Sequence, residues 1–154
     1  MVQISAYKSC AAFVREARKA GYGGTFYNVS FVGSQALADE LGAEGRGVMI
    51  SQVMPHPFST TTGIAREYLD AVKRSGGSNP PNYSSKEGYV AARVLAEGLR
   101  RAARPLTREG LVTALEQMPR LDLGGFTVNF SPKSHAGSTF VELTMLTEDG
   151  KVRR

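Results

Sequence analysis

The fold of this chain is decided by residues 2–33, VQISAYKSCAAFVREARKAGYGGTFYNVSFVG. Residues 2–7 alternate apolar and polar side chains, which is the period of a β-strand. Residues 12–20 then place alanine and phenylalanine at helical spacing, with charged side chains largely on the other side, and the glycines of 21–24 end that helix. Residues 25–29 are β-branched and aromatic, so a second strand follows. The stretch predicts a parallel strand–helix–strand unit.

The two strand ends of this unit carry polar and aromatic side chains. Tyr7-Lys8-Ser9 follows the first strand, and Asn28-Val29-Ser30-Phe31 ends the second. Ligands of open α/β sheets bind beyond the carboxyl ends of the parallel strands, so we expect Tyr7, Ser9, Asn28, Ser30 and Phe31 to contact a small polar molecule. Ser9 is also placed to cap the helix. The alternative is structural, with Tyr7 and Tyr27 as half-buried packing residues and Ser30 in a turn.

Composition and charge exclude several classes of protein. The chain has 154 residues, 42% of them hydrophobic and 21% charged, as is ordinary for a globular protein of one domain or slightly more. No segment reaches the run of about 18 apolar residues of a membrane helix, and residues 1–4 do not begin a signal peptide. Cys10 is the single cysteine, and we expect a buried structural thiol. The net charge of +5 is spread over helix faces without a nucleic-acid-binding motif, so we expect no nucleic-acid partner.

The rest of the chain predicts further helices on both sides of a proline-rich break, and then a return to strands. Pro55 and Pro57 force an extended path between two substructures. A capping box at Ser84–Glu87 opens the longest helix, and Thr107 caps the last one. The expected helices are 34–41, 62–75, 84–103 and 107–118, and the expected strands are 48–53, 126–130 and 140–146, with a hairpin turn at 148–151. The near-continuous apolar run of 48–53 predicts a strand buried on both faces.

The sequence contains no motif of an enzyme active site or a cofactor site. It lacks a phosphate loop, GxGxxG, HExxH and CxxC, and residues 32–36, VGSQA, do not form a GxSxG elbow because the second glycine is missing. His56 and His135 have no histidine, cysteine or acid at ligand spacing, so a metal or catalytic role is the weaker interpretation of both. We therefore expect neither catalysis nor a cofactor.

The order of several short stretches resembles a known family. These stretches are AAFVREARKAG (11–21), FYN (26–28), GRGVMISQVMP (45–55), EGYVAA (87–92) and GFTVNFS (125–131). Together they resemble the leucine/isoleucine/valine-binding protein family, which comprises type I periplasmic substrate-binding proteins of ABC transporters. The resemblance covers essentially the whole chain, but it matches only the carboxy-terminal part of such a protein, less than half of it.

The resemblance implies a fold class and a division of the chain. Members of the family have two α/β lobes that close on the ligand. Residues 1–54 and 121–154 would form the second lobe, an α/β lobe with a parallel sheet of the type I periplasmic-binding-protein fold. Residues 58–118 would be helices that cover the absent first lobe.

The resemblance also assigns site residues. Tyr7 matches an aromatic position that contacts the ligand, and Tyr83 is a candidate from the other lobe. Ser30 falls where amino-acid-binding members often have an acid for the ligand's ammonium group. A serine cannot pair a charge, so a carboxylate or amide ligand is as well supported as an amino acid.

Two functions are open at this stage. The first is a truncated solute-binding protein of an ABC importer, which binds a small amino acid or related carboxylate or amide, works with an ABC permease in the periplasm and performs no chemistry. The second is a free-standing oligomeric interaction or regulatory domain that reuses an α/β lobe. In both cases the helix faces without a first lobe predict that this chain forms a homodimer or larger oligomer.

Overall fold

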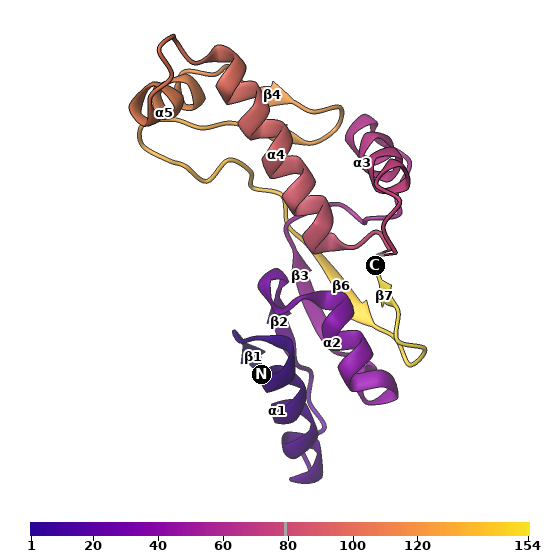
Figure 1. Ribbon diagram of the computed structural model, residues 1–154. Coiled ribbons are helices and arrows are strands. Elements are labelled where there is room, and N and C mark those ends of the chain that lie inside the picture. Colours follow the sequence, from indigo (N-terminus) through magenta and orange to yellow (C-terminus); the bar gives the residue numbers. More distant parts are fainter. Residues whose placement is uncertain (79) are drawn as a thin grey trace. The chain divides into compact units, whose positions relative to one another are not determined.

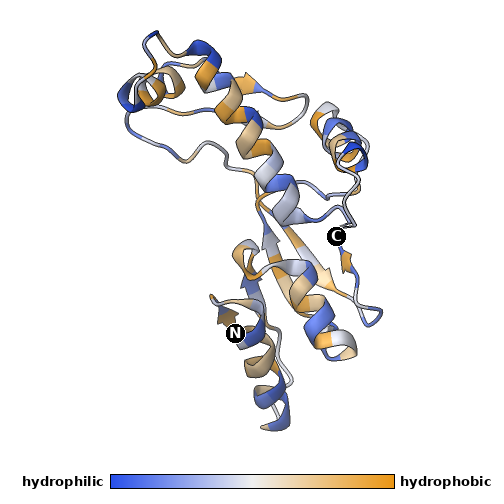
Figure 2. Ribbon diagram, viewed as in Figure 1, coloured by the Kyte–Doolittle hydropathy of each residue, from blue (hydrophilic) through white to orange (hydrophobic). Residues whose placement is uncertain are grey.

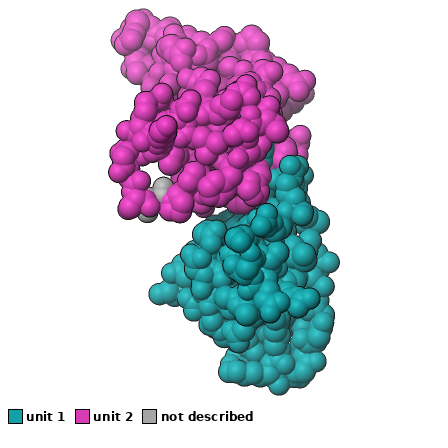
Figure 3. All heavy atoms as spheres, turned by 90° about the vertical axis from the view of Figure 1, so that its right-hand side faces the viewer, with its two compact units in different colours: residues 1–55, 141–154 teal, residues 56–140 magenta. Residues whose placement is uncertain are grey.

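The computed structural model describes residues 1–78 and 80–154 and divides the chain into two compact units. Unit 1 comprises residues 1–55 and 141–154, and unit 2 comprises residues 56–140 (Figure 3). The chain therefore passes from one unit to the other at 55/56, inside the expected proline-rich break, and again at 140/141.

A five-stranded sheet forms the centre of unit 1, in the order β1-β2-β3-β6-β7 (Figure 1). Its first two pairings are parallel and confirm the expected strand–helix–strand unit, whereas β6 and β7 join antiparallel. The strands are β1 Val2–Gln3, β2 Tyr27–Val29, β3 Met49–Gln52, β6 Glu142–Leu146 and β7 Val152–Arg153. The first strand is shorter than the alternating pattern of residues 2–7 predicts, because α1 already begins at Tyr7.

Two helices, α1 (Tyr7–Lys19) and α2 (Ser34–Leu41), supply the helical side of the unit 1 core. Val14 of α1 and Leu37 of α2 are fully buried in one cluster with Phe26, Ile50 and Leu146. This cluster also holds Cys10 (2% exposed), so the expectation of a buried thiol is confirmed. Burial raises the pKa of the Cys10 thiol, which keeps it neutral at pH 7.

The other face of the unit 1 sheet is left open. Alternation along the strands turns Val2, Tyr27 and Met145 away from the buried cluster, and all three are exposed. Leu143, on the same face of β6, is 54% exposed. The expectation that residues 48–53 are buried on both faces is wrong, because β3 alternates between buried and half-buried side chains.

Unit 2 consists of three helices and a short hairpin. The helices are α3 Gly63–Arg74, α4 Tyr83–Arg101 and α5 Arg108–Glu116, and the hairpin pairs β4 Leu121–Asp122 with β5 Thr127–Val128. Figure 2 shows apolar and polar residues alternating around α3 and α4, as amphipathic helices require. Gly98 lets α4 approach α5 closely, because a Cβ at this position would lie 2.7 Å from Leu115 Cδ2.

The β4–β5 hairpin lies in the compact unit of the helices, whereas the division into lobes at residue 121 stays a prediction. Leu121 pairs with Val128 inside the hairpin instead of joining the sheet of unit 1. Its turn is fastened to the start of α3, where the Ile64 N–H donates to the Gly124 carbonyl at 3.2 Å. Residues 121–140 therefore belong to the compact unit of the helices.

Helix capping differs from the expectation at two of three positions. Asn82 caps α4 and forms a reciprocal capping box with Ser85, so the predicted box at Ser84–Glu87 is wrong by two residues. Ser9 lies inside the first turn of α1 and caps nothing, because Ala6 is the N-cap residue. The prediction for Thr107 is confirmed, since its hydroxyl accepts the Gly110 N–H at 3.0 Å. Among the described residues, no helix is long and apolar enough to cross a bilayer.

Candidate functional site

The carboxyl ends of three parallel strands share one edge of the unit 1 sheet. Gln3 of β1 pairs with Asn28 of β2, which pairs in turn with Ile50 of β3. Because the strands run in the same direction, the segments that leave them emerge side by side. These segments are the start of α1, the 3-10 turn η1 (Ser30–Val32) and residues 53–55. This is the edge where open α/β sheets bind ligands.

The start of α1 offers backbone donors at this edge. No side chain caps the helix, so the N–H groups of its first turn have no partner within the helix. Tyr7 is half-buried and Ser9 is exposed in that turn, and the Lys8 ammonium lies 6.0 Å from the centre of the Tyr7 ring. The helix dipole adds a partial positive charge there. The arrangement suits a ligand group that accepts hydrogen bonds.

The end of β2 contributes a hydroxyl and an exposed ring. Ser30 is half-buried in η1, and Phe31 beside it is 70% exposed. Asn28, by contrast, is buried on the helix side of the sheet. Strand alternation explains this difference, because Tyr27 lies on the open face and Asn28 therefore points to the core.

Tyr83 is the one predicted site residue in unit 2. It is the first residue of α4 and is 8% exposed, with its ring 5.9 Å from the ring of His56 in an edge-to-face arrangement. The family resemblance alone singles it out in the sequence, and its burial depends on packing that the sequence does not show. Its part in a shared site stays a prediction.

A buried polar network that sequence reasoning missed lies at the end of β3. Gln52 is fully buried, and its side-chain amide donates to Ser34 Oγ at 2.7 Å and to Thr144 Oγ1 at 2.9 Å. These three residues connect the end of β3 to the first residue of α2 and to β6. Ser34 lies 18 positions and Thr144 92 positions from Gln52 along the chain, so no local sequence pattern predicts the network. The network holds the start of α2 in place beside the strand ends.

Glu142 is a second residue that the sequence did not single out. It pairs with Gln52 because β6 runs antiparallel to β3, which brings the first residue of β6 to the carboxyl end of β3. Its side chain is only 12% exposed, and its carboxylate forms an ion pair of 2.9 Å with Arg154. A carboxylate near the strand ends is therefore already paired within the chain.

The strand ends themselves carry no acid. Residues 1–15, 17–38 and 45–66 contain no aspartate or glutamate. Apart from Glu142, which is paired with Arg154, acids of unit 1 lie elsewhere, as in Glu40 and Glu44, which pair with Arg15 at 3.2 and 2.6 Å. The combination of Lys8, the first turn of α1 and hydroxyl groups favours acceptor or anionic groups of a ligand over an ammonium group.

Neither histidine takes part in a metal centre of the described residues. No group of three or more histidine, cysteine or acidic side chains in the described part of the chain could hold an ion. His135 Nε2 lies 2.8 Å from Glu116 Oε1 in an exposed pair. His56 contacts the rings of Phe58 and Tyr83, and its carbonyl accepts the Lys86 ammonium at 3.1 Å.

Comparison with known proteins places the chain in a family. The profile of the periplasmic binding protein family matches residues 1–151, so the chain belongs to that family. This confirms the resemblance that the sequence indicates. None of the curated proteins compared with the chain matches it.

Solved structures give the same result. A possible leucine/isoleucine/valine-binding protein from Rhodopirellula baltica is 30% identical, with a TM-score of 0.89 over 99% of this chain and 42% of that protein. A substrate-binding periplasmic protein from Ralstonia solanacearum is 32% identical, with a TM-score of 0.84 over 99% and 44%. An extracellular ligand-binding receptor from Verminephrobacter eiseniae is 27% identical, with a TM-score of 0.82 over the same shares. The chain thus spans less than half the length of these proteins, and its α/β architecture matches one lobe of the type I periplasmic-binding-protein fold.

Proposed function

We propose that this chain is the carboxy-terminal part of a solute-binding protein of an ABC importer. The observation that carries the proposal is the shared edge of β1, β2 and β3, where an uncapped helix start, Ser30 and the exposed ring of Phe31 follow neighbouring parallel strands. Membership in the periplasmic binding protein family supports a solute-binding role for such an edge.

The proposed ligand is a small amino acid or a related carboxylate or amide. Backbone N–H groups of the α1 start and the hydroxyls of Tyr7, Ser9 and Ser30 would receive its acceptor oxygens. Tyr7 and Phe31 would contact its apolar part. Asn28 would reach the ligand only through its buried amide, whose polar atoms have no partner among the described residues.

In this proposal the ligand closes between two lobes and no bond is made or broken. Unit 1 would be the main part of the second lobe, and Tyr83 would contribute from the other lobe. The part of a complete family member that this chain does not span would form the rest of the two lobes. The complete protein would work in the periplasm and deliver its solute to an ABC permease.

A free-standing oligomeric interaction domain is the second candidate, and one observation favours it. The open face of the unit 1 sheet carries Val2, Tyr27, Leu143 and Met145 in exposed positions. A row of apolar side chains of this kind marks an interaction surface. In either candidate function, we expect this chain to associate with itself when it is alone.

The two candidates differ in the size of the native polypeptide. An antibody raised against this chain would detect, in its source cells, a periplasmic band of more than twice 16.6 kDa if the transport proposal holds. A cytoplasmic band of 16.6 kDa would overturn that proposal and leave the interaction domain.

Ligand binding by the native polypeptide tests the site. Leucine, isovalerate and leucinamide would be screened for a rise in melting temperature, since a ligand of the folded state stabilises it. Tyr7→Ala should weaken the binding of the best ligand about fivefold or more, as expected for a lost aromatic contact worth ~1 kcal/mol. Tyr27→Ala is the control, because Tyr27 lies on the open sheet face. Equal affinity in wild type and Tyr7→Ala would remove Tyr7 from the site.

A further inference from the structure

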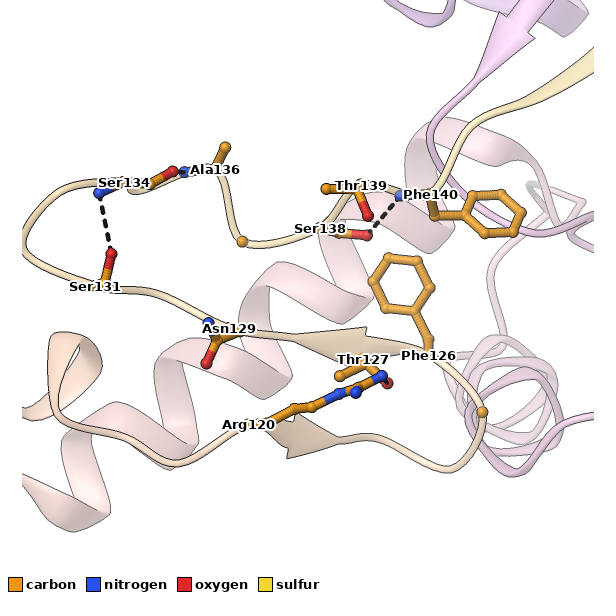
Figure 4. A pocket seen from close by; sticks show the side chains of 12 residues that line it. Arg120, Phe126, Thr127, Asn129, Ser131, Ser134, Ala136, Ser138, Thr139 and Phe140 are labelled. Atoms are coloured by element: carbon orange, nitrogen blue, oxygen red, sulfur yellow. Dashed lines mark hydrogen bonds between the residues drawn. The ribbon is translucent and has the colours of Figure 1, made fainter.

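Unit 2 contains a pocket that the proposed solute site does not use. It has a volume of about 750 Å³, within the range of small-molecule sites. Its wall comes entirely from residues 120–140, which are the β4–β5 hairpin and the loop that follows it (Figure 4). The pocket is thus complete within one compact unit.

Short hydrogen bonds give the loop around the pocket a defined shape. The Asn129 N–H donates to the Gly137 carbonyl at 2.8 Å, and Ser131 and Ser134 exchange two backbone hydrogen bonds of 3.0 Å. Gly137 also fits tightly over Phe130, because a Cβ on it would lie 2.7 Å from that ring. The loop is therefore fastened to the strand by its own backbone hydrogen bonds and by close packing at Gly137.

Three serine hydroxyls of the pocket accept a backbone N–H of their own loop. Ser131 Oγ accepts the Ser134 N–H at 3.2 Å, Ser134 Oγ accepts the Ala136 N–H at 3.4 Å, and Ser138 Oγ accepts the Phe140 N–H at 3.1 Å. Figure 4 marks the bonds from Ser134 to Ser131 and from Phe140 to Ser138 with dashed lines. A hydroxyl that accepts through its oxygen keeps its own proton to donate. Each of these hydroxyls therefore still has a proton to donate to a ligand.

Arg120 adds the only full charge among the described residues that line the pocket. Its guanidinium lies beside Thr127, with Nη2 3.5 Å from Thr127 Oγ1, and it forms no ion pair within the described chain. The nearest acid along the hairpin, Asp122, is occupied by the N–H groups of Gly124 and Gly125 at 2.8 and 2.9 Å. The guanidinium therefore keeps its charge-assisted donors for a ligand.

An apolar wall complements these donors. Phe126 and Phe140 pack edge to face, with their ring centres 6.0 Å apart, and both line the pocket. Phe126 is buried and Phe140 is half-buried, so both rings are held by packing, and they form the apolar side of a pocket that Arg120 and the serines also line.

We propose that the pocket between the β4–β5 hairpin and residues 131–140 binds a small organic oxyanion, whose charged group meets Arg120 beside Thr127 and whose apolar body lies against Phe126 and Phe140, while the serine hydroxyls line the rest of the pocket. A carboxylate and a phosphate ester share this chemistry. The inference does not rest on the proposed solute site, since it concerns other residues in the other unit.

Titration of the isotope-labelled chain with benzoate and with phenyl phosphate tests the proposal. Binding of either probe should shift the backbone amide signals of Ser131, Ser134 and Ser138 in a saturable way, and the stronger probe identifies the oxyanion. Arg120→Gln should weaken that binding about tenfold or more, because it removes charge-assisted hydrogen bonds.

Arg108→Gln is the matched control, because Arg108 is an exposed arginine of unit 2 outside the pocket. It should leave the affinity unchanged, and circular dichroism should show both variants folded. Absence of saturable shifts with both probes, or equal affinity in wild type and Arg120→Gln, would overturn the proposal.

Discussion

Two buried amides on neighbouring strands of unit 1 have different hydrogen-bonding states. Gln52 donates to Ser34 and Thr144, whereas neither polar atom of the Asn28 side chain has a partner among the described residues. Burying a polar group without a partner costs free energy, and removing one member of a satisfied pair strands the other. The two side chains should therefore respond differently to replacement by leucine.

Gln52→Leu should lower the free energy of unfolding by about 1–3 kcal/mol, because it leaves the buried hydroxyl of Ser34 without its partner. Asn28→Leu should change the free energy by less than about 1 kcal/mol or raise it, because it removes unsatisfied atoms. Urea unfolding followed by circular dichroism measures both. The account fails if Asn28→Leu proves the more destabilising of the two.

At the scale of residues, the sequence predicts where a strand ends better than it predicts the face of the sheet to which each side chain points. Tyr7 and Ser30 follow the ends of β1 and β2 as the sequence predicts, although their contact with a ligand stays a prediction, and the expectation of a buried Cys10 thiol is confirmed. Asn28 shows the limit, because a shift of one position along a strand exchanges the two faces of the sheet. Gln52 and Glu142 were missed because their roles depend on the register of β6, about 90 residues away along the chain.

At the scale of elements, two residues are candidates for the N-cap of α4: Asn82, which the structure shows, and Ser84, which the sequence predicts. Asn82→Ala should destabilise the protein by about 1 kcal/mol, since it leaves the Ser85 N–H without its 2.9 Å acceptor. Ser84→Ala should have little effect, because Ser84 is an exposed residue within the helix. Thermal unfolding of the two variants decides between them, and a larger loss in Ser84→Ala would restore the box at Ser84–Glu87.

The turn between β6 and β7 predicts a dependence on pH. Hydrogen bonds from Lys151 and Thr147 lower the pKa of Asp149 to about 2. An unfolded aspartate titrates near ~3.9, so the charged carboxylate stabilises the fold fully above that pH and the contribution is lost as the pH falls toward 2. The melting temperature of the wild type should therefore fall more between pH 5 and pH 2 than that of Asp149→Asn. If the melting temperatures of the two proteins fall in parallel with pH, the Asp149 carboxylate does not contribute to stability.

Helices were easier to predict than strands because their patterns are longer. The four expected helices after the first exist within about two residues of their structural bounds, as amphipathic periods over several turns allow. The first helix begins at Tyr7, before its expected cap at Ser9. Strands of two residues, such as β1, β4 and β5, lack the length to show a period. The pairing of β4 with β5 in residues 121–128 could therefore not be inferred from the sequence.

At the scale of the whole molecule, the sheet of unit 1 is covered by helices on one face only. Parallel strands are normally buried on both faces, yet Val2, Tyr27, Leu143 and Met145 of this chain are exposed. The chain also spans only 42% of the length of its relative from Rhodopirellula baltica. The order of the stretches in the sequence indicates that the chain matches only part of such a protein. Only the structure shows that one face of the unit 1 sheet is exposed.

The open face leads to a prediction for the isolated chain. Light scattering at micromolar concentration should detect a dimer or larger species, because association removes exposed apolar surface from water. The double substitution Leu143→Lys and Met145→Lys should shift the population toward monomer, since two ammonium groups on this face oppose its burial. Val112→Lys, at an exposed position of α5 in unit 2, is the control and should leave the distribution unchanged. A monodisperse monomer of the unmodified chain would contradict the prediction, and an oligomer insensitive to both lysines would move the interface away from the sheet.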